Sequence, residues 1–308
     1  TAEYDVFTEV EPAIAYVKSK TIPIVIKADG LAAGKGVVIA MTEEEAIATI
    51  NDMLSGNKFG EAGHRVVIEE FLEGEEASFI VMVDGKNVLP LASSQDHKAR
   101  DEGDTGPNTG GMGAYSPAPV VDAAMHDRIM QEVILPTVEG MASEGRTYTG
   151  FLYAGVMITK DGVPKTLEFN CRFGDPETQP IMMRLKSDLV ALCLAAINGS
   201  LDKCNAEWDE RAALGVVTAS AGYPASASKG DVINGLDSVN NQSVKVFHAG
   251  TKDDNGNIVT AGGRVLCITG LGENVTQAQA QAYKAVNNIN YEGMFYRKDI
   301  GYRAVKRE

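Results

Sequence analysis

Three pairs of short apolar runs constrain the fold of this chain more than any other sequence feature. Residues 22–27 and 37–41 are β-branched runs that flank a glycine-rich turn, and the other two pairs turn at Asp84-Gly85 and Asp161-Gly162. An Asp-Gly step between apolar runs is a strong hairpin signal, and the two strands of a hairpin are antiparallel. The sequence therefore predicts sheets that are built from hairpins.

Helical patterns alternate with these hairpins. Thr42 and Glu45 form a capping box at the start of one such segment. The apolar run over residues 189–197 predicts a buried helix segment. Apolar spacing predicts helices over residues 9–20, 42–54, 122–141, 188–198 and 275–289. Helices and hairpins together place the chain in the α+β class.

The chain is long enough for two or three domains, with 308 residues. A pattern of short apolar runs and many glycines begins near Asp209, and it predicts a separate, β-rich C-terminal domain. We expect boundaries that give three parts, over residues 1–72, 73–208 and 209–308. Residues 93–119 form a polar, glycine-rich stretch, which predicts either a functional loop or a disordered one.

Charge and hydropathy exclude several classes of partner. The net charge is −14, whereas a general nucleic-acid binder or a binder of anionic membranes would be basic. No apolar run approaches the roughly 20 residues of a membrane span. Four cysteines lie far apart without a C-x-x-C pair, which argues against zinc or a disulfide framework and favours the cytoplasm. We therefore expect small-molecule substrates, with no nucleic acid and no membrane as partners.

The first candidate site is the glycine hairpin Lys27-Ala-Asp-Gly-Leu-Ala-Ala-Gly34-Lys35-Gly36. It departs from a P-loop, because Gly30 and Gly34 are one residue too close and Gly36 replaces the Ser or Thr that holds Mg²⁺. Such a hairpin can fold over a triphosphate and donate backbone N–H groups while two lysines neutralise charge. A mobile hairpin with two solvated lysines explains these residues equally well.

The second candidate is Glu69-Glu70-Phe71-Leu72, at the end of a strand expected over residues 66–70 and followed by Glu76. An apolar pair beside carboxylates suits an adenine slot, where backbone groups read the base edge and a carboxylate receives the ribose hydroxyls. The alternative is a strand that ends in a solvated acidic turn.

The third candidate combines Glu168, Asn170 and Arg172. Residues two apart on a strand share a face, so Glu168 and Asn170 present hard oxygen ligands suited to Mg²⁺ that bridges phosphates. Leu167 and Phe169 are expected to face the core. Arg172 is suited to hold a carboxylate or a phosphate bidentately. The alternative is a hairpin edge on which Glu168 forms a salt bridge with Arg172.

The fourth candidate is the polar stretch from Ser94 to Tyr115, which contains Asp96 and a cluster of glycines at residues 110–113. Clustered glycines allow the backbone to approach a small anionic substrate closely. A flexible surface loop is the alternative.

The four stretches together, in this order, resemble the glycinamide ribonucleotide synthetase family of ATP-grasp ligases. The motifs that carry the resemblance are the glycine hairpin, EEFL, DTGPNTGGMGAYSP and LEFNCRFGDPETQ, with GGRVLCITGLG and RKDIGYRA near the end. The resemblance implies an ATP-grasp fold, with a small lid subdomain over 1–72, a large subdomain over 73–208 and the C-terminal domain over 209–308. It also implies a carbon–nitrogen ligase that phosphorylates the carboxylate of glycine with ATP and transfers the glycyl group to 5-phosphoribosylamine.

The resemblance implies a role for each matching residue, with Mg²⁺ or Mn²⁺ as the metal and ATP as the co-substrate. Arg172 and Asp96 would be catalytic, and Glu168 and Asn170 would hold the metal. ATP would be bound by Lys27, Gly34, Lys35, Gly36, Glu69, Glu70, Phe71, Leu72 and Glu76. Glycine and phosphoribosylamine would be bound by Asp104, Asn108, Gly111, Met112, Gly113 and Asp175.

Members of this family begin with a further domain that helps to bind phosphoribosylamine, and this chain begins at Thr1 without it. We therefore expect that missing N-terminal domain to be a partner, and the chain alone to lack useful ligase activity. A fragment that binds nucleotide without catalysis is one alternative, and another ATP-grasp carboxylate–amine ligase is the second. A biotin carboxylase would need a further acidic metal ligand near residues 151–156, where the sequence has none.

Overall fold

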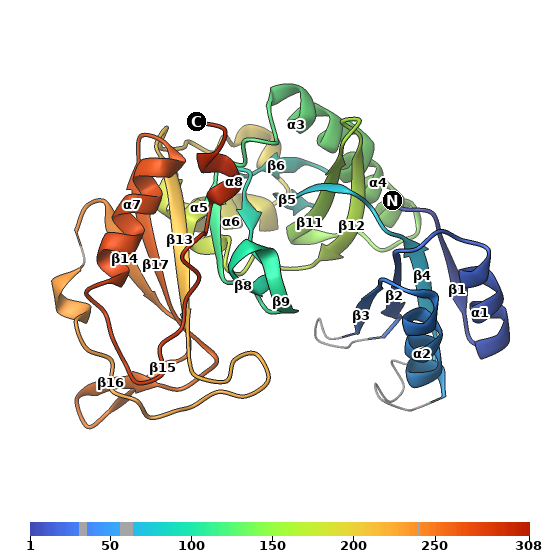
Figure 1. The fold of residues 1–308 in the computed structure, drawn as a ribbon. Helices are drawn as coiled ribbons and strands as arrows, with labels where there is room; N and C mark the ends of the chain where they lie inside the picture. The colour runs from blue at the N-terminus through green and yellow to red at the C-terminus, as the bar shows by residue number, and fades with distance from the viewer. Residues whose placement is uncertain (31–35, 56–63, 240) are drawn as a thin grey trace. The chain divides into compact units, whose positions relative to one another are not determined.

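The computed structural model of the chain describes residues 1–30, 36–55, 64–239 and 241–308 (Figure 1). Its contacts divide it into two units. Unit 1 comprises Thr1–Gly74 and Thr159–Leu167, and unit 2 comprises Glu75–Ile158 and Glu168–Glu308. The expected three-part division of the chain stays a prediction.

Unit 1 is an antiparallel sheet with two helices packed on one face. Thr42 caps the second helix, since its Oγ1 accepts a hydrogen bond from the Glu45 amide at 3.1 Å, while the Glu45 carboxylate accepts one from the Met41 amide at 2.8 Å. The capping box is therefore confirmed. The strands, in sheet order, are β1 (Tyr4–Phe7), β4 (Val66–Glu70), β2 (Ile24–Ala28) and β3 (Val37–Ala40), and the helices are α1 (Val10–Lys18) and α2 (Glu43–Leu54).

The strand register separates the two faces of this sheet. Ile24, Ile26 and Ile68 pack with α1 and α2 in one apolar core. On the opposite face Lys27 pairs with Val37 of β3, and Ile39 lies two residues further along the same strand. The side chains of Val37 and Ile39 are about two-fifths exposed, at 42% and 41%. We call this side, which faces away from the two helices, the open face of unit 1.

Unit 2 contains a five-stranded antiparallel sheet that joins distant parts of the chain. Helix α7 (Val275–Val286) packs against it (Figure 1). The strands, in sheet order, are β14 (Val244–His248), β17 (Arg264–Gly272), β13 (Ala212–Ala219), β10 (Gly113–Ser116) and β7 (Gln95–Asp96). Residues 93–119 are therefore neither structureless nor disordered, whereas a functional role for this segment stays a prediction. Its strands β7 and β10 form because they pair with each other and with β13.

A second sheet of unit 2 has apolar side chains on both faces. Phe79 and Val81 pack toward α3 (Ala123–Ile129) and α4 (Leu135–Ser143), whereas Ile80 and Met82 pack toward α5 (Thr178–Arg184) and α6 (Leu189–Ile197). The strands, in sheet order, are β12 (Pro164–Asn170), β11 (Thr149–Thr159), β5 (Gly74–Asp84) and β6 (Val88–Pro90). Smaller elements of unit 2 are β8 (Ala99–Asp101), β9 (Thr105–Asn108), β15 (Thr251–Asp254), β16 (Asn257–Thr260) and α8 (Tyr302–Val305).

Two burial predictions are wrong. Helix α6 buries Leu192 and Ala196 but exposes Val190 and Ile197, because only one side of the helix meets the core. Phe169 is 39% exposed, since it lies near the end of the edge strand β12.

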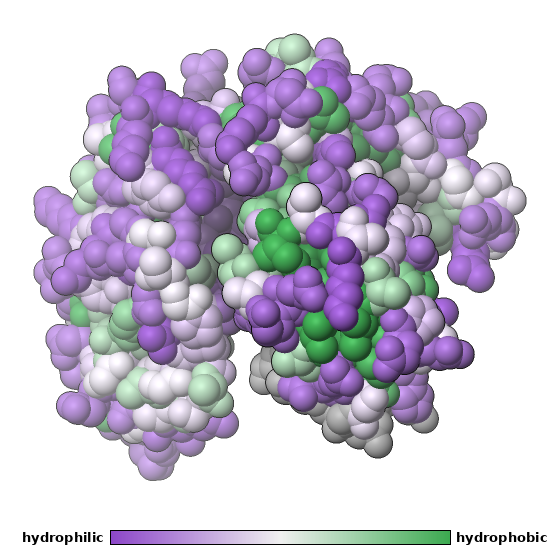
Figure 2. Space-filling view, turned by 45° about the vertical axis from the view of Figure 1, so that its right-hand side comes forward, coloured by the Kyte–Doolittle hydropathy of each residue, from purple (hydrophilic) through white to green (hydrophobic). Residues whose placement is uncertain are grey.

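The visible surface in Figure 2 is largely hydrophilic with smaller apolar areas. Within the described residues, no helix has the length and apolarity needed to span a bilayer.

Candidate active site

Glu168 and Asn170 lie side by side at the end of β12, as their spacing predicts. Asn170 Nδ2 donates a hydrogen bond to Glu168 Oε1 at 3.2 Å. A carboxylate and an amide oxygen fit the hard ligand set of Mg²⁺. The described residues contain no group of three or more His, Cys, Asp or Glu that could hold a metal ion.

A second carboxylate, Glu76, lies next to this pair and forms an ion pair with Lys98. A Cβ atom added to Gly155 would lie 3.4 Å from Glu168 Cγ and 3.5 Å from Glu76 Oε1, so both carboxylates approach the same glycine. Burial alone would lower the pKa of Lys98. The charges of Asp96 and Glu76 raise it by more, so the pKa lies above its ordinary value. The Lys98 ammonium group therefore compensates the acidic side chains around it.

Asp96 is the most perturbed carboxyl group of this region. Burial raises its pKa well above the ordinary value, the charge of Glu177 raises it further, and the charge of Lys98 opposes this rise. Burial likewise raises the pKa of Glu177, whose Oε1 accepts a hydrogen bond from Ser78 Oγ at 2.8 Å. Perturbed carboxyl groups beside a lysine are typical of functional sites.

Arg172 is exposed at the edge of the same region. Its guanidinium carbon lies 5.8 Å from the centroid of the Tyr153 ring, and its Nη1 donates to the Phe173 carbonyl at 2.8 Å. The charge of Arg172 partly offsets the rise in the pKa of Glu177 that burial causes. We call the six residues Glu76, Asp96, Lys98, Glu168, Asn170 and Arg172 the unit 2 cluster.

On the open face of unit 1, Lys27 forms an ion pair with Glu69. Lys27 Nζ also donates to the Leu167 carbonyl at 3.4 Å. Gly36 closes the glycine hairpin, because its carbonyl accepts a hydrogen bond from the Ala28 amide at 2.8 Å. Gly34 and Lys35 lie outside the described residues. The structure thus brings Lys27 and Glu69 together.

The other residues of the second candidate site, Glu70, Phe71 and Leu72, line a different part of unit 1. Glu70 follows Glu69 on β4 and therefore points to the other side, where its carboxylate lies 3.7 Å from Lys165 Nζ. Glu70, Phe71 and Leu72 line a cavity of about 590 Å³ within unit 1. Other residues along this cavity include Tyr16, Lys20, Lys160 and Lys165.

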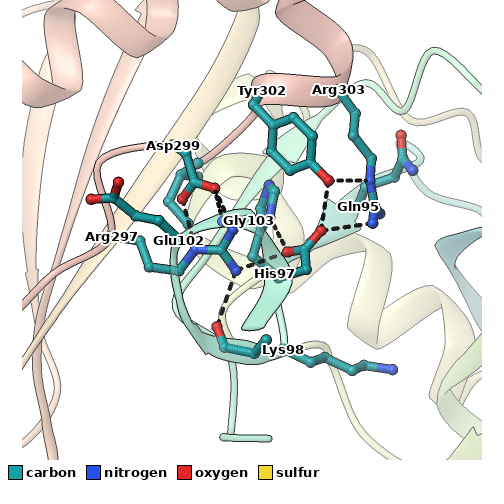
Figure 3. Close-up of polar contacts among 12 residues, drawn as sticks. Gln95, His97, Lys98, Glu102, Gly103, Arg297, Asp299, Tyr302 and Arg303 are labelled. Atoms are coloured by element: carbon teal, nitrogen blue, oxygen red, sulfur yellow. Dashed lines mark hydrogen bonds and ion pairs between the residues drawn. The ribbon is translucent and has the colours of Figure 1, made fainter. Parts of the chain in front are cut away.

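Asp104 lies at the centre of a polar network that links the segment after β8 to the C-terminal end of the chain (Figure 3). Its Oδ1 accepts from Arg297 Nη1 at 2.9 Å and contacts His97 Nδ1 at 3.3 Å. Its Oδ2 accepts from Tyr302 OH and from Arg303 Nη2, both at 2.7 Å. Both oxygens thus have partners within the chain, and the substrate-binding role of Asp104 stays a prediction. We call Asp104 and these four partners the Asp104 network.

Gly110 and Gly111 are linked to Asp175 by one side chain, Arg264 of β17. Arg264 Nη1 donates to the Gly110 carbonyl at 2.6 Å and to the Asp175 carbonyl at 3.2 Å, and its Nη2 donates to Asp175 Oδ2 at 2.6 Å. Gly111 has a φ of 112°, and a Cβ atom there would lie 2.3 Å from Pro176 Cδ, so the position requires glycine. Two predicted substrate segments are therefore neighbours.

The other predicted substrate residues are less available. Met112 is fully buried in the apolar core of the five-stranded sheet, so only its backbone remains for a ligand, and that backbone bonds to His97 and Val217. Gly113 is buried, and its carbonyl accepts from the His97 amide at 2.9 Å. Asn108 is exposed on β9 opposite Ala99.

Sequence reasoning missed Lys98, Glu177 and Arg264. Side-chain alternation could have identified Lys98. It lies two residues after Asp96, so in an extended segment both side chains point to the same side. Glu177 and Arg264 act through contacts between segments that are far apart in the sequence, so no spacing rule points to them.

Comparisons with known proteins agree with these features. The family described as phosphoribosylglycinamide synthetase, ATP-grasp (A) domain, matches residues 1–178, and the C domain of the same family matches residues 213–303. The chain is 67% identical over its whole length to a phosphoribosylamine–glycine ligase of Vibrio vulnificus, of which it covers 72%. It is 66% identical to the ligase of Escherichia coli O157:H7, again with all of this chain and 72% of the relative aligned.

Solved structures show the same fold. The crystal structure of a phosphoribosylamine–glycine ligase from Thermotoga maritima matches with a TM-score of 0.89 and 37% identity over 97% of this chain and 74% of that one. A biotin carboxylase domain from Hydrogenobacter thermophilus, in complex with MgADP and bicarbonate, matches with a TM-score of 0.74 at 15% identity over 96% of this chain and 64% of that one. The predicted α+β class and ATP-grasp fold are confirmed, and the chain belongs to the phosphoribosylglycinamide synthetase family of ligases.

Proposed function

We propose that this chain forms the ATP-grasp and C-terminal regions of a phosphoribosylamine–glycine ligase of purine biosynthesis. A carboxylate oxygen of glycine attacks the γ-phosphorus of ATP, and ADP leaves. The amine nitrogen of 5-phosphoribosylamine then attacks the acyl carbon of glycyl phosphate, loses a proton, and phosphate leaves as glycinamide ribonucleotide forms. The observation that carries this proposal is the unit 2 cluster, which combines oxygen ligands with two cationic side chains.

The cluster suits such a phosphoryl transfer because the reaction depends on alignment and on neutralising charge. Glu168 and Asn170 are the residues that would hold Mg²⁺, and Mn²⁺ is a second candidate for the same oxygens. Mg²⁺ bound there would neutralise the phosphate oxygens of ATP. Arg172 is exposed beside the metal pair, and we propose that it receives the reacting carboxyl group or the transferred phosphoryl group.

Asp96 and Lys98 supply the second half of the proposal. Lys98 offers a cation to the reacting carboxylate, and Asp96 offers a carboxyl group to an amine. Glu76, proposed for the ribose hydroxyls, is paired with Lys98 in this structure and would exchange that partner on binding. Gly111, Gly113, Asn108 and Asp175 remain proposed substrate contacts, chiefly through backbone groups of the first two.

The open face of unit 1 is the proposed nucleotide surface. Val37 and Ile39 provide apolar contact area, and the Lys27–Glu69 pair provides one cation and one carboxylate. We propose that Lys27 neutralises phosphate charge, that backbone groups of the segment from Glu69 to Leu72 read the adenine edge, and that Gly34, Lys35 and Gly36 cover the phosphates. A cytoplasmic location agrees with the free cysteines found among the described residues.

The test replaces Glu168 by Gln in the full-length protein and measures ADP release that depends on both glycine and phosphoribosylamine. Turnover should fall by about two or more orders of magnitude at saturating Mg²⁺, while the melting temperature stays within a few degrees. Glu144→Gln, at an exposed position at the end of α4, is the matched control and should retain full turnover. Normal turnover of Glu168→Gln would remove the metal assignment. ADP release that another carboxylate supports better than glycine does would favour a different ATP-grasp ligase.

A further inference from the structure

We propose that His97 is a positioning residue that holds the segment from Asp96 to Lys98, which follows directly from β7, against the C-terminal segment of the chain. This inference rests on the proposed function, in which Asp96 and Lys98 act at the reacting groups. His97 does not itself belong to the unit 2 cluster, and no contact with a substrate is assigned to it.

The strand needs such support because it has few backbone bonds of its own. β7 is the edge strand of its sheet, and its neighbour there is β10. The His97 amide donates to the Gly113 carbonyl at 2.9 Å, and its carbonyl accepts from the Met112 amide at 2.8 Å. These bonds hold the backbone of His97 next to β10, and its side chain adds contacts with other parts of the chain.

The His97 side chain adds contacts that restrain the segment from Asp96 to Lys98. Its Nε2 accepts a hydrogen bond from the Gly301 amide at 2.9 Å, which leaves the proton on Nδ1, and Nδ1 faces Asp104 Oδ1 at 3.3 Å. The ring is 2% exposed and lies between the rings of Tyr115 and Tyr302, at centroid distances of 6.1 Å and 5.8 Å. The imidazole therefore has a polar partner at each nitrogen and two aromatic rings nearby.

The groups that receive His97 are themselves immobilised. Arg297 is fully buried, and besides Asp104 it binds the Ala99 carbonyl at 3.0 Å and both oxygens of Asp299 at 2.8 Å and 2.7 Å. Asp299 in turn accepts from the Gly103 amide at 2.8 Å. Figure 3 shows Arg297 and Asp299 on one side of the His97 ring and Tyr302 and Arg303 on the other. The restraint on His97 is thus rigid.

Alternation along the strand carries this restraint to the unit 2 cluster. Successive side chains of an extended segment point to opposite sides, so Asp96 and Lys98 point away from the direction of His97. In Figure 3 the Lys98 side chain extends away from the Asp104 network, and its ammonium group pairs with Glu76. A rotation at His97 would displace both neighbours together. Displacements of about 1 Å at a reacting centre can lower turnover by about 100-fold.

Two matched substitutions test the inference in the full-length protein. His97→Asn places an amide near the position of Nδ1 and loses the acceptor for Gly301, whereas His97→Gln places an amide near Nε2 and loses the contact with Asp104. We expect each variant to lower kcat by about 10- to 100-fold while KM for ATP changes by less than about twofold. The loss should persist well below the melting temperature. Val286→Ala, in the core of α7, is the control for lost stability and should keep its kcat.

Parallel variants separate this inference from the proposed function. Asp96→Asn should abolish turnover, and if it retains full turnover the proposed role of Asp96 fails. If Asp96→Asn is inactive while both His97 variants keep the kcat of Val286→Ala, the positioning role of His97 is wrong. Should neither His97 variant fold, Tyr302→Phe loosens Asp104 with His97 in place. A lowered kcat with unchanged KM for ATP would then support the inference, and an unchanged kcat would overturn it.

Discussion

Replacing Arg297 by Met should produce the largest loss of stability that any single charged residue of the Asp104 network can cause. Arg297 is fully buried, and its guanidinium donates two hydrogen bonds to Asp299, one to Asp104 and one to the Ala99 carbonyl. Asp104 keeps Tyr302 and other donors after the substitution. Asp299 keeps the Gly103 amide but loses its cation, so most of the cost falls on Asp299.

The magnitude follows from the burial of this pair. Removal of one partner of a buried ion pair costs about 3–5 kcal/mol, because the remaining charge is left without compensation. For a unit of roughly 200 residues, about 2–4 °C of melting temperature corresponds to each kcal/mol, which predicts a fall of roughly 6–20 °C. Urea unfolding followed by circular dichroism, with calorimetry for the melting temperature, measures both quantities.

Arg211→Met is the matched control for this experiment. Arg211 also holds a carboxylate bidentately, that of Asp209, but its side chain is 35% exposed. Water replaces the lost contacts there, so the cost should remain below about 1 kcal/mol. Equal losses in Arg297→Met and Arg211→Met would refute the argument that burial determines the cost.

Two further predictions concern single side chains. Asp84 accepts hydrogen bonds from backbone amides that include Leu201, and its pKa in the folded state is lowered to about 2. Its contribution to the free energy of unfolding is therefore present above the ordinary pKa of 3.8 and is lost as the pH falls toward 2. Asp84→Asn should therefore reduce stability at pH 6 by more than at pH 2.5, as urea titrations at both values would measure. Arg264→Met releases the Gly110 carbonyl and Asp175, and it should raise KM for glycine or phosphoribosylamine by about tenfold or more while KM for ATP stays constant in steady-state kinetics.

Sequence patterns predicted the elements whose signals are local. The helix that Thr42 caps, the strand at residues 66–70 and the shared face of Glu168 and Asn170 all follow from spacing within a few residues. The strands within residues 93–119 were missed, because β10 forms by pairing with β13 about a hundred residues later. Polar and glycine-rich composition describes the local preference, and the distant partner overrides it.

The Asp104 network shows the same limit for the site. The family resemblance implied a substrate-binding role for Asp104, which stays a prediction. In the structure its partners include Arg297 and Arg303, which lie more than 190 residues later in the chain. No rule based on spacing can connect such residues, whereas Lys98 could have been included from strand alternation alone.

Lys98→Met tests the electrostatic balance of the unit 2 cluster. The substitution keeps most of the apolar stem of Lys98 and removes its positive charge. The ammonium group pairs with Glu76 and interacts with Asp96 and Glu168. Burial and the charge of Glu177 already raise the pKa of Asp96, and without the opposing cation this pKa should rise further above that of the unfolded chain. A raised carboxyl pKa in the folded state lowers stability as the pH increases through that value. The loss of unfolding free energy caused by Lys98→Met should therefore be larger at pH 8 than at pH 5. Urea unfolding at both pH values measures this difference, with Lys245→Met, on the exposed side of β14, as the control that should show none. A loss that is equal at the two pH values would mean that Lys98 contributes packing and not compensation of the surrounding carboxylates.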